Sequence, residues 1–236
     1  MGTDNLFHKR KAKAKDLQRK LPRRQRYEKV LIVCEGGKTE PLYFTEVKDH
    51  YEIDTANIRI SGDCGAAPIS VVSHGEALYA EESKYGEPFD KVFCVFDRDQ
   101  HESFEEALNK IKTLKPAGVF NAIYTTPCFE FWLLLHFTFT SAPFVSDGRF
   151  SSGALALREL QNYLPDYTKG ATDIFSALIN QLGTAHAYAE QLEAESRRTG
   201  SKNPYTNVQT LLSYLKNIKA NPAQPPQTQI ARRKQR

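Results

Sequence analysis

The chain has 236 residues, of which 40% are hydrophobic and 25% are charged, a composition that can support a core and is ordinary for a soluble protein. No apolar stretch approaches the roughly 20 residues that a membrane-spanning helix needs, and the N-terminus has no apolar signal region. The four cysteines, at positions 34, 64, 94 and 128, match no paired metal-ligand spacing. We therefore expect a cytoplasmic protein in a reducing compartment, with no membrane partner.

The net charge of +4 conceals an uneven distribution. Residues 1–26 hold ten Lys or Arg against two Asp, and residues 232–236 add four basic residues, which leaves about −8 for residues 27–231. Dense basic segments bind nucleic acid because they replace its condensed counterions, although solvated tails would have the same composition. The nucleic-acid contacts predicted in this arm are Arg10, Lys11, Lys13, Lys15, Arg19, Lys20, Arg23, Arg24 and Arg26.

Short apolar runs alternate with helical patterns through the first part of the chain. The predicted strands are 29–34, 57–61, 91–96 and 119–125, and the predicted helices are 39–50, 68–83, 101–114 and one that starts at Thr126-Pro127 and holds 128–137. Such alternation predicts an α/β fold with a four-stranded, mostly parallel sheet sandwiched by helices.

The character of the sequence changes after residue 138. A loop-like stretch is followed by predicted helices at 152–163, 172–198 and 205–219. We expect four regions, namely a disordered basic arm (1–26), an α/β domain (27–137), a helical C-terminal extension packed on that domain (138–219) and a disordered basic tail (220–236).

Acidic residues follow two of the predicted strands directly. Glu35 comes after the first strand and before two glycines, and Asp97 and Asp99 come after the third. Ligands bind outside the carboxyl ends of the strands in an open parallel sheet, so we expect these carboxylates to share one crevice. Oxygen ligands of this kind suit Mg²⁺ or Mn²⁺. The alternatives are a helix N-terminal role for Glu35 and a capping role for Asp99, because Glu102 completes a capping-box pattern.

Further candidates lie near these motifs. Lys38 and Arg98 are the nearest cations and could neutralise a phosphoryl oxygen. Glu130 is the only charge in an apolar helix, so it either faces the site or lies on an exposed stripe or in a buried salt bridge. His136, six residues later, does not share its face, and is either a core histidine or a ligand. Lys38-Thr39 does not belong to a phosphate-binding P-loop, because Ile32 stands where that loop needs glycine.

The motifs Val33-Cys-Glu-Gly-Gly-Lys-Thr-Glu40 and Val95-Phe-Asp-Arg-Asp99 resemble the Toprim fold of topoisomerases, primases and several nucleases. The resemblance narrows to the RloB family at Cys34-Glu-Gly-Gly-Lys-Thr-Glu-Pro-Leu-Tyr-Phe44, Pro127-Cys-Phe-Glu-Phe-Trp-Leu-Leu-Leu-His-Phe137 and Asn203-Pro-Tyr-Thr206. It covers about residues 22–218. Family members often have Ser where this chain has Tyr205.

The resemblance implies that Glu35, Asp97 and Asp99 bind the metal, with Glu130 and His136 as site neighbours. It also implies a bacterial or archaeal protein that works with an AAA-type, RloA-like ATPase in defence against phage. We accordingly predict a Mg²⁺- or Mn²⁺-dependent nuclease with Glu35, Asp97, Asp99, Glu130 and Lys38 as catalytic residues, acting on DNA or RNA, with transfer RNA among the candidates. Arg98 and His136 complete the predicted nucleic-acid contacts. The alternatives are a non-catalytic sensor or adaptor bound to the ATPase, and a nucleotidyl or phosphoryl transferase.

Overall fold

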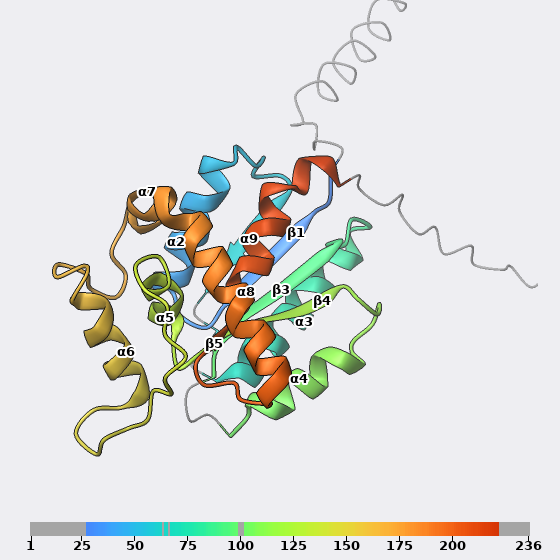
Figure 1. Ribbon diagram of the computed structural model, residues 1–236. Coiled ribbons are helices and arrows are strands. Elements are labelled where there is room, and N and C mark those ends of the chain that lie inside the picture. Colours follow the sequence, from blue (N-terminus) through green and yellow to red (C-terminus); the bar gives the residue numbers. More distant parts are fainter. Residues whose placement is uncertain (1–26, 63, 66, 99–101, 222–236) are drawn as a thin grey trace, which may run out of the picture.

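The computed structural model describes residues 27–62, 64–65, 67–98 and 102–221, so the predicted basic arm, most of the predicted tail and Asp99 lie outside the described residues. The described chain forms a five-stranded sheet in the order β2-β1-β3-β4-β5, in which all neighbours are parallel except β4 and β5 (Figure 1). The strands are β1 (Val30–Cys34), β2 (Ile58–Ser61), β3 (Lys91–Asp97), β4 (Phe120–Thr126) and β5 (Tyr205–Thr206).

Helices follow each of the parallel strands and continue after the last one. They are α2 (Thr39–His50), α3 (Pro68–Lys84), α4 (Phe104–Thr113), α5 (Phe129–Leu134), α6 (Ser152–Gln161), α7 (Ile174–Leu178), η1 (Ile179–Gln181), α8 (Leu182–Thr199), α9 (Val208–Lys216) and η2 (Ile218–Ala220). The predicted α/β architecture with a mostly parallel, Toprim-like sheet and a helical C-terminal part is confirmed, with one strand more than expected.

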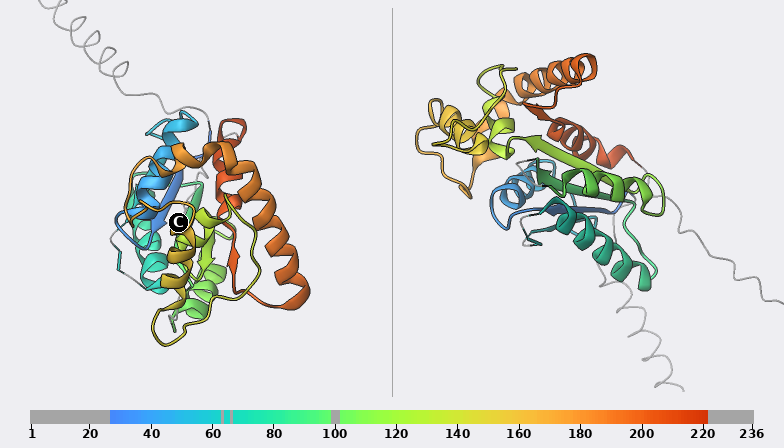
Figure 2. Two further views of the ribbon diagram at one scale, coloured as in Figure 1. Left: turned by 60° about the vertical axis from the view of Figure 1, so that its left-hand side comes forward. Right: turned by 90° about the horizontal axis from the view of Figure 1, so that it is seen from below.

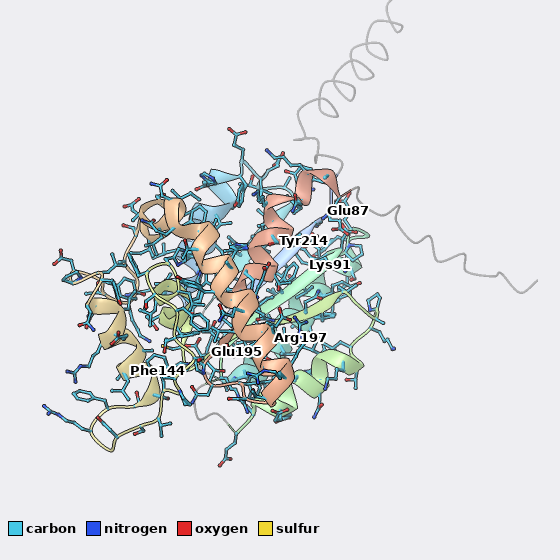
Figure 3. The ribbon with its side chains drawn as sticks, viewed as in Figure 1. Glu87, Lys91, Phe144, Glu195, Arg197 and Tyr214 are labelled. Atoms are coloured by element: carbon cyan, nitrogen blue, oxygen red, sulfur yellow. The ribbon has the colours of Figure 1, made fainter. Side chains whose placement is uncertain are left out.

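The central strands are apolar along their whole length because helices cover both faces of the sheet. Val30 and Ile32 point into a core with α2, α8 and α9, whereas Leu31 and Val33 point into a second core with α3 and α4. Figure 2 shows this layering, with α3 on one side of the sheet and α8 and α9 on the other. Tyr214, labelled in Figure 3, lies on α9 with its ring centroid 5.0 Å from that of Phe93 on β3.

The fifth strand corrects the prediction of a helix from residue 205. Tyr205 and Thr206 pair with the end of β4, and the hydroxyls of Thr206 and Thr125 lie 3.0 Å apart. The Asn207 side chain then accepts from the Tyr124 amide at 2.7 Å and donates to the Ala122 carbonyl at 3.0 Å. These contacts cover polar groups that an edge strand would otherwise leave open, and α9 begins only at Val208.

Two other predicted helices also have different limits. Thr126 belongs to β4, and the helix that follows is capped by Cys128 and ends at Leu134. The predicted 172–198 helix begins only at Ile174, because Asp173 before it has a left-handed φ of 63°, and the 3-10 turn η1 then separates α7 from α8. This break lets Phe175 pack its ring against Tyr43 while α8 crosses the sheet.

None of the helices in the described ranges combines the length and the apolar character that crossing a bilayer would require.

Gly62 directly follows β2 and leaves no room for a side chain. A Cβ at Gly62 would lie 2.5 Å from the Gly36 carbonyl oxygen and 3.0 Å from Gly37 Cα. Because these are backbone atoms, we expect Gly62→Ala to lower the free energy of unfolding by about 1–3 kcal/mol. Gly183→Ala is the control, since a Cβ there meets nothing within 4 Å, and it should leave stability equal or slightly higher. Equal denaturation midpoints for the two variants would contradict this contact.

Candidate active site

A pocket of about 460 Å³ opens where β1 and β3 end. The chain runs from β1 to β2 on one side of β1 and then crosses to β3 on its other side, so the strand order reverses at this edge. Ligands bind at such a point in open α/β sheets. Among the described residues, four carboxylates and two lysines line it, giving a formal charge of −2. The lining consists of Glu35, Gly36, Gly37, Lys38, Thr39, Glu40, Asp97, Glu130 and Lys169.

The parallel register of β1 and β3 brings Glu35 to Asp97. Cys34 is opposite Val95, and the next amide, that of Glu35, donates to the Val95 carbonyl at 3.1 Å. The Glu35 side chain then reaches across the strand ends, where its Oε2 accepts from the Asp97 backbone amide at 3.0 Å. The structure thus brings these two predicted residues into one pocket.

Glu40 adds a third carboxylate from the first turn of α2. It lies on the buried face of this helix with Tyr43, Phe44 and Val47, and is only 8% exposed. Burial first, and then the carboxylates of Glu130 and Glu35, raise the pKa of Glu40 from 4.5 to about 7, whereas a backbone hydrogen bond and Lys169 oppose the shift. Glu40 is therefore close to half protonated at neutral pH.

Glu130 supplies the fourth carboxylate from the first turn of α5, at 1% exposure. Its Oε1 accepts a hydrogen bond from the Tyr167 hydroxyl at 3.3 Å, and its Oε2 lies 3.4 Å from Lys169 Nζ. Of the alternatives for Glu130, the exposed stripe is wrong. The buried ion pair and the position in the site both hold, because Lys169 lines the same pocket.

The pKa of Asp97 is also raised well above its ordinary value. Loss of water around the carboxyl group is the main cause, and Glu40, Glu35 and Glu130 add to it, whereas Lys169 acts in the opposite direction. Carboxylates that raise each other's pKa share one electrostatic environment, and either a proton or a cation can relieve their repulsion.

The segment around Gly170 packs closely against the first residues of α2, beside these carboxylates. Lys38 is the N-terminal cap residue of α2, and a Cβ at Gly170 would lie 3.1 Å from its Cβ. The Gly170 amide donates to Thr39 Oγ1 at 3.0 Å. The segment between α6 and α7 therefore closes over the start of α2 and delivers Lys169 to the pocket.

The donor set suits a hard divalent cation, because buried carboxylates outnumber the lysines beside them. Within the described ranges, no three His, Cys, Asp or Glu side chains are arranged to hold a metal ion as they stand. The predicted set of Glu35, Asp97 and Asp99 includes one residue outside those ranges. Of that set, the structure brings Glu35 and Asp97 together.

The remaining predicted residues lie apart from the pocket or outside the described chain. Arg98 follows Asp97, but its guanidinium packs 5.0 Å from the Phe104 ring centroid and lines a neighbouring pocket. His136 is 2% exposed, and its Nδ1 lies 3.2 Å from the carbonyl oxygens of Trp132 and Leu133. The structure therefore favours the core interpretation of His136 over contact with nucleic acid. The basic arm lies outside the described residues.

Cysteine chemistry is disfavoured at this site. Cys128 lies near the pocket, but burial raises the pKa of its thiol well above the usual range, and the charges of Glu130 and Asp97 add to the shift. A thiol held in the neutral form is a poor nucleophile.

Sequence reasoning did not select Glu40 or place Lys169. The signal for Glu40 was present, since it precedes the buried Tyr43, Phe44 and Val47 by three, four and seven residues and so shares their helical face. Lys169 has no comparable local signal, because only the tertiary fold brings it to Glu130.

The comparison with protein families matches a model described as RloB-like protein over residues 30–215. The matched region includes all four carboxylates and Lys169. The comparison with curated proteins finds no match.

The pKa of Glu40 predicts a pH-dependent stability difference. Because the folded-state pKa is about 7 against an ordinary 4.5, the folded protein binds more protons between these values, and stability is lost as pH rises through them. Chemical denaturation is followed in the presence of a metal chelator. As pH rises from 4.5 to 8, the free energy of unfolding of Glu40→Gln should increase by about 3 kcal/mol relative to that of the parent.

Glu81→Gln is the control for this experiment, because Glu81 lies exposed on α3. The difference in free energy of unfolding between Glu81→Gln and the parent should stay constant over the same pH range. A constant difference for Glu40→Gln as well would show that burial and the neighbouring carboxylates do not raise the pKa of Glu40.

Proposed function

The chain belongs to the RloB-like family, and on that footing we propose that it is a divalent-metal-dependent nuclease that hydrolyses phosphodiester bonds in nucleic acid. The observation that carries this proposal is the pocket where Glu35, Glu40, Asp97 and Glu130 meet beside Lys38 and Lys169. Carboxylates suit a metal ion, and lysines suit the phosphate that the metal would bind.

Glu35, Asp97 and Asp99 would hold the metal, which when bound activates water and stabilises charge on the scissile phosphate. Glu130 is already engaged by Tyr167 and Lys169, so its role is to fix Lys169 at the pocket wall. Lys169 and Lys38 would offset phosphate charge. Gly36 and Gly37 leave room for a phosphate to approach the backbone.

Glu40 is the residue best suited to move a proton. Its pKa is about 7 without a metal, and a bound cation would lower this pKa and so favour the ionised form that a general base needs. In the proposed step the Glu40 carboxylate accepts a proton from the attacking water. The water oxygen forms a bond to phosphorus while the bond from phosphorus to the leaving oxygen breaks. Glu35, one of the catalytic residues predicted from the sequence, is the alternative base.

The family resemblance supplies the proposed setting. We propose that the protein acts in prokaryotic defence against phage, together with an AAA-type ATPase, on DNA or RNA. A purely structural adaptor would have no need of four carboxylates in one pocket, which favours the nuclease over that alternative.

The catalytic assignment is tested with Asp97→Asn. The purified full-length protein is incubated with Mg²⁺ or Mn²⁺ and with single-stranded DNA, duplex DNA, RNA and transfer RNA, with and without the ATPase. We expect metal-dependent cleavage by the parent, and a loss of about a hundredfold or more in Asp97→Asn, because the variant removes a charged ligand.

Asp49→Asn is the control, since Asp49 is an exposed carboxylate near the end of α2 with 67% of its side chain accessible, and it should cleave at the parent rate. Equal cleavage by Asp97→Asn and the parent would contradict the assignment. ATPase binding without cleavage of any substrate would favour the adaptor instead.

A further inference from the structure

A second pocket, of about 480 Å³, lies next to the carboxylate pocket. The two share a wall, because Asp97 lines one and Arg98 the other, and because Thr126 lines the second pocket four residues before Glu130 in the first. Its volume is within the range of small-molecule sites, roughly 300–1,000 Å³. Of its lining residues, only Arg98 is among the nucleic-acid contacts predicted from the sequence.

The charge of this pocket is opposite to that of its neighbour. Its described lining contains Arg98 and Lys202 and no carboxylate. Residues 27–231 together carry about −8, so a pocket lined by two cations and no described carboxylate differs from the charge of this part of the chain. Lys202 Nζ lies 5.5 Å from the Tyr124 ring centroid, and Arg98 packs on Phe104, so aromatic rings steady both cations. An anionic ligand suits this pocket.

Phe144 and Val145 make part of the lining apolar. Phe144, labelled in Figure 3, lies on the segment between α5 and α6, and its ring packs edge-on against Phe131 with centroids 5.8 Å apart. The Asn203 side chain accepts from the Phe144 amide at 3.1 Å and donates to its carbonyl at 2.9 Å. Val145, beside it, is 66% exposed although it is a large hydrophobic residue.

A polar group in the lining also lacks a partner. The Thr126 hydroxyl is buried and makes no hydrogen bond within the described part of the chain. Unpaired buried hydroxyls are costly, and a ligand can satisfy them. The pocket therefore offers cations, a spare hydroxyl and an exposed apolar wall, which together match a phosphate joined to a flat aromatic base.

We propose that this second pocket holds one nucleotide of the substrate strand next to the scissile phosphate, with its phosphate toward Arg98 and Lys202 and its base against Phe144 and Val145. This inference rests on the proposed nuclease function and specifies its substrate. A base can enter such a cavity only when it is unpaired, so the substrate is single-stranded or has a splayed-out nucleotide at the cleavage position.

The test measures binding without cleavage. The full-length protein with Asp97→Asn is titrated onto a short fluorescein-labelled single strand, of DNA and then of RNA, and followed by fluorescence anisotropy. Val145→Glu places a negative charge in the exposed wall, and Lys202→Met removes a cation. Each variant should weaken binding about tenfold. Lys202→Met should also reduce the steepness of the slope of log K against log salt concentration by about one.

Matched controls lie at the opposite end of the sheet. Tyr85 is 79% exposed and Lys84 is the exposed last residue of α3, a helix that runs antiparallel to the strands. Tyr85→Glu and Lys84→Met make the same charge changes as the test variants and should alter binding less than about twofold. Thermal midpoints of all four variants should match the parent, since all four residues lie at the surface or at a pocket wall.

Two results would overturn the proposal. One is equal binding by each test variant and its control, that is, by Val145→Glu and Tyr85→Glu and by Lys202→Met and Lys84→Met. The other is that a duplex of the same sequence binds as tightly as the single strand and is weakened as strongly by Val145→Glu. The outcome is separate from that of the nuclease test. If Val145→Glu and Lys202→Met weaken binding but the parent shows no metal-dependent cleavage, only the proposed nuclease function is contradicted. If cleavage depends on Asp97 but the test variants bind like their controls, only the nucleotide pocket is contradicted.

Discussion

The whole site depends on one electrostatic constraint, which is the crowding of four carboxylates around one pocket. The parallel register of β1 and β3 forces Glu35 and Asp97 to one edge, and α2 and α5 bring Glu40 and Glu130 to the same place. Burial and mutual repulsion raise the pKa values of Glu40 and Asp97. A fold that maintains such repulsion gains from it only when a cation or a proton is part of the function.

The rest of the fold acts as support for this constraint. Helices on both faces make the strand ends rigid, and the segment before α7 returns to the sheet so that Tyr167 and Lys169 contact Glu130. The segment between α8 and β5 returns a second time with Lys202, which faces the neighbouring pocket. The part of the chain after residue 138 therefore completes both pockets, whereas the four carboxylates of the first pocket come from the part before it.

Sequence patterns could locate the sheet and part of the site. Glu35 and Asp97 were predictable because each ends a continuous apolar run, and parallel strands bring such positions to one edge. Glu40 was harder, because an acid in the first turn of a helix is usually explained by the helix dipole. β5 has two residues and so no periodicity to detect. The contact of Lys169 with Glu130 spans the fold and has no local signal.

The most direct measurement is the pH titration of the Glu40 carboxyl group, followed by its ¹³C chemical shift with and without Mg²⁺. The account predicts a midpoint near pH 7 without the metal, a lower midpoint when Glu130→Gln removes a neighbouring charge, and a lower midpoint again when Mg²⁺ favours the ionised form. A midpoint near the ordinary value of 4.5 in all three samples would contradict the convergence of charge on which the proposed function rests.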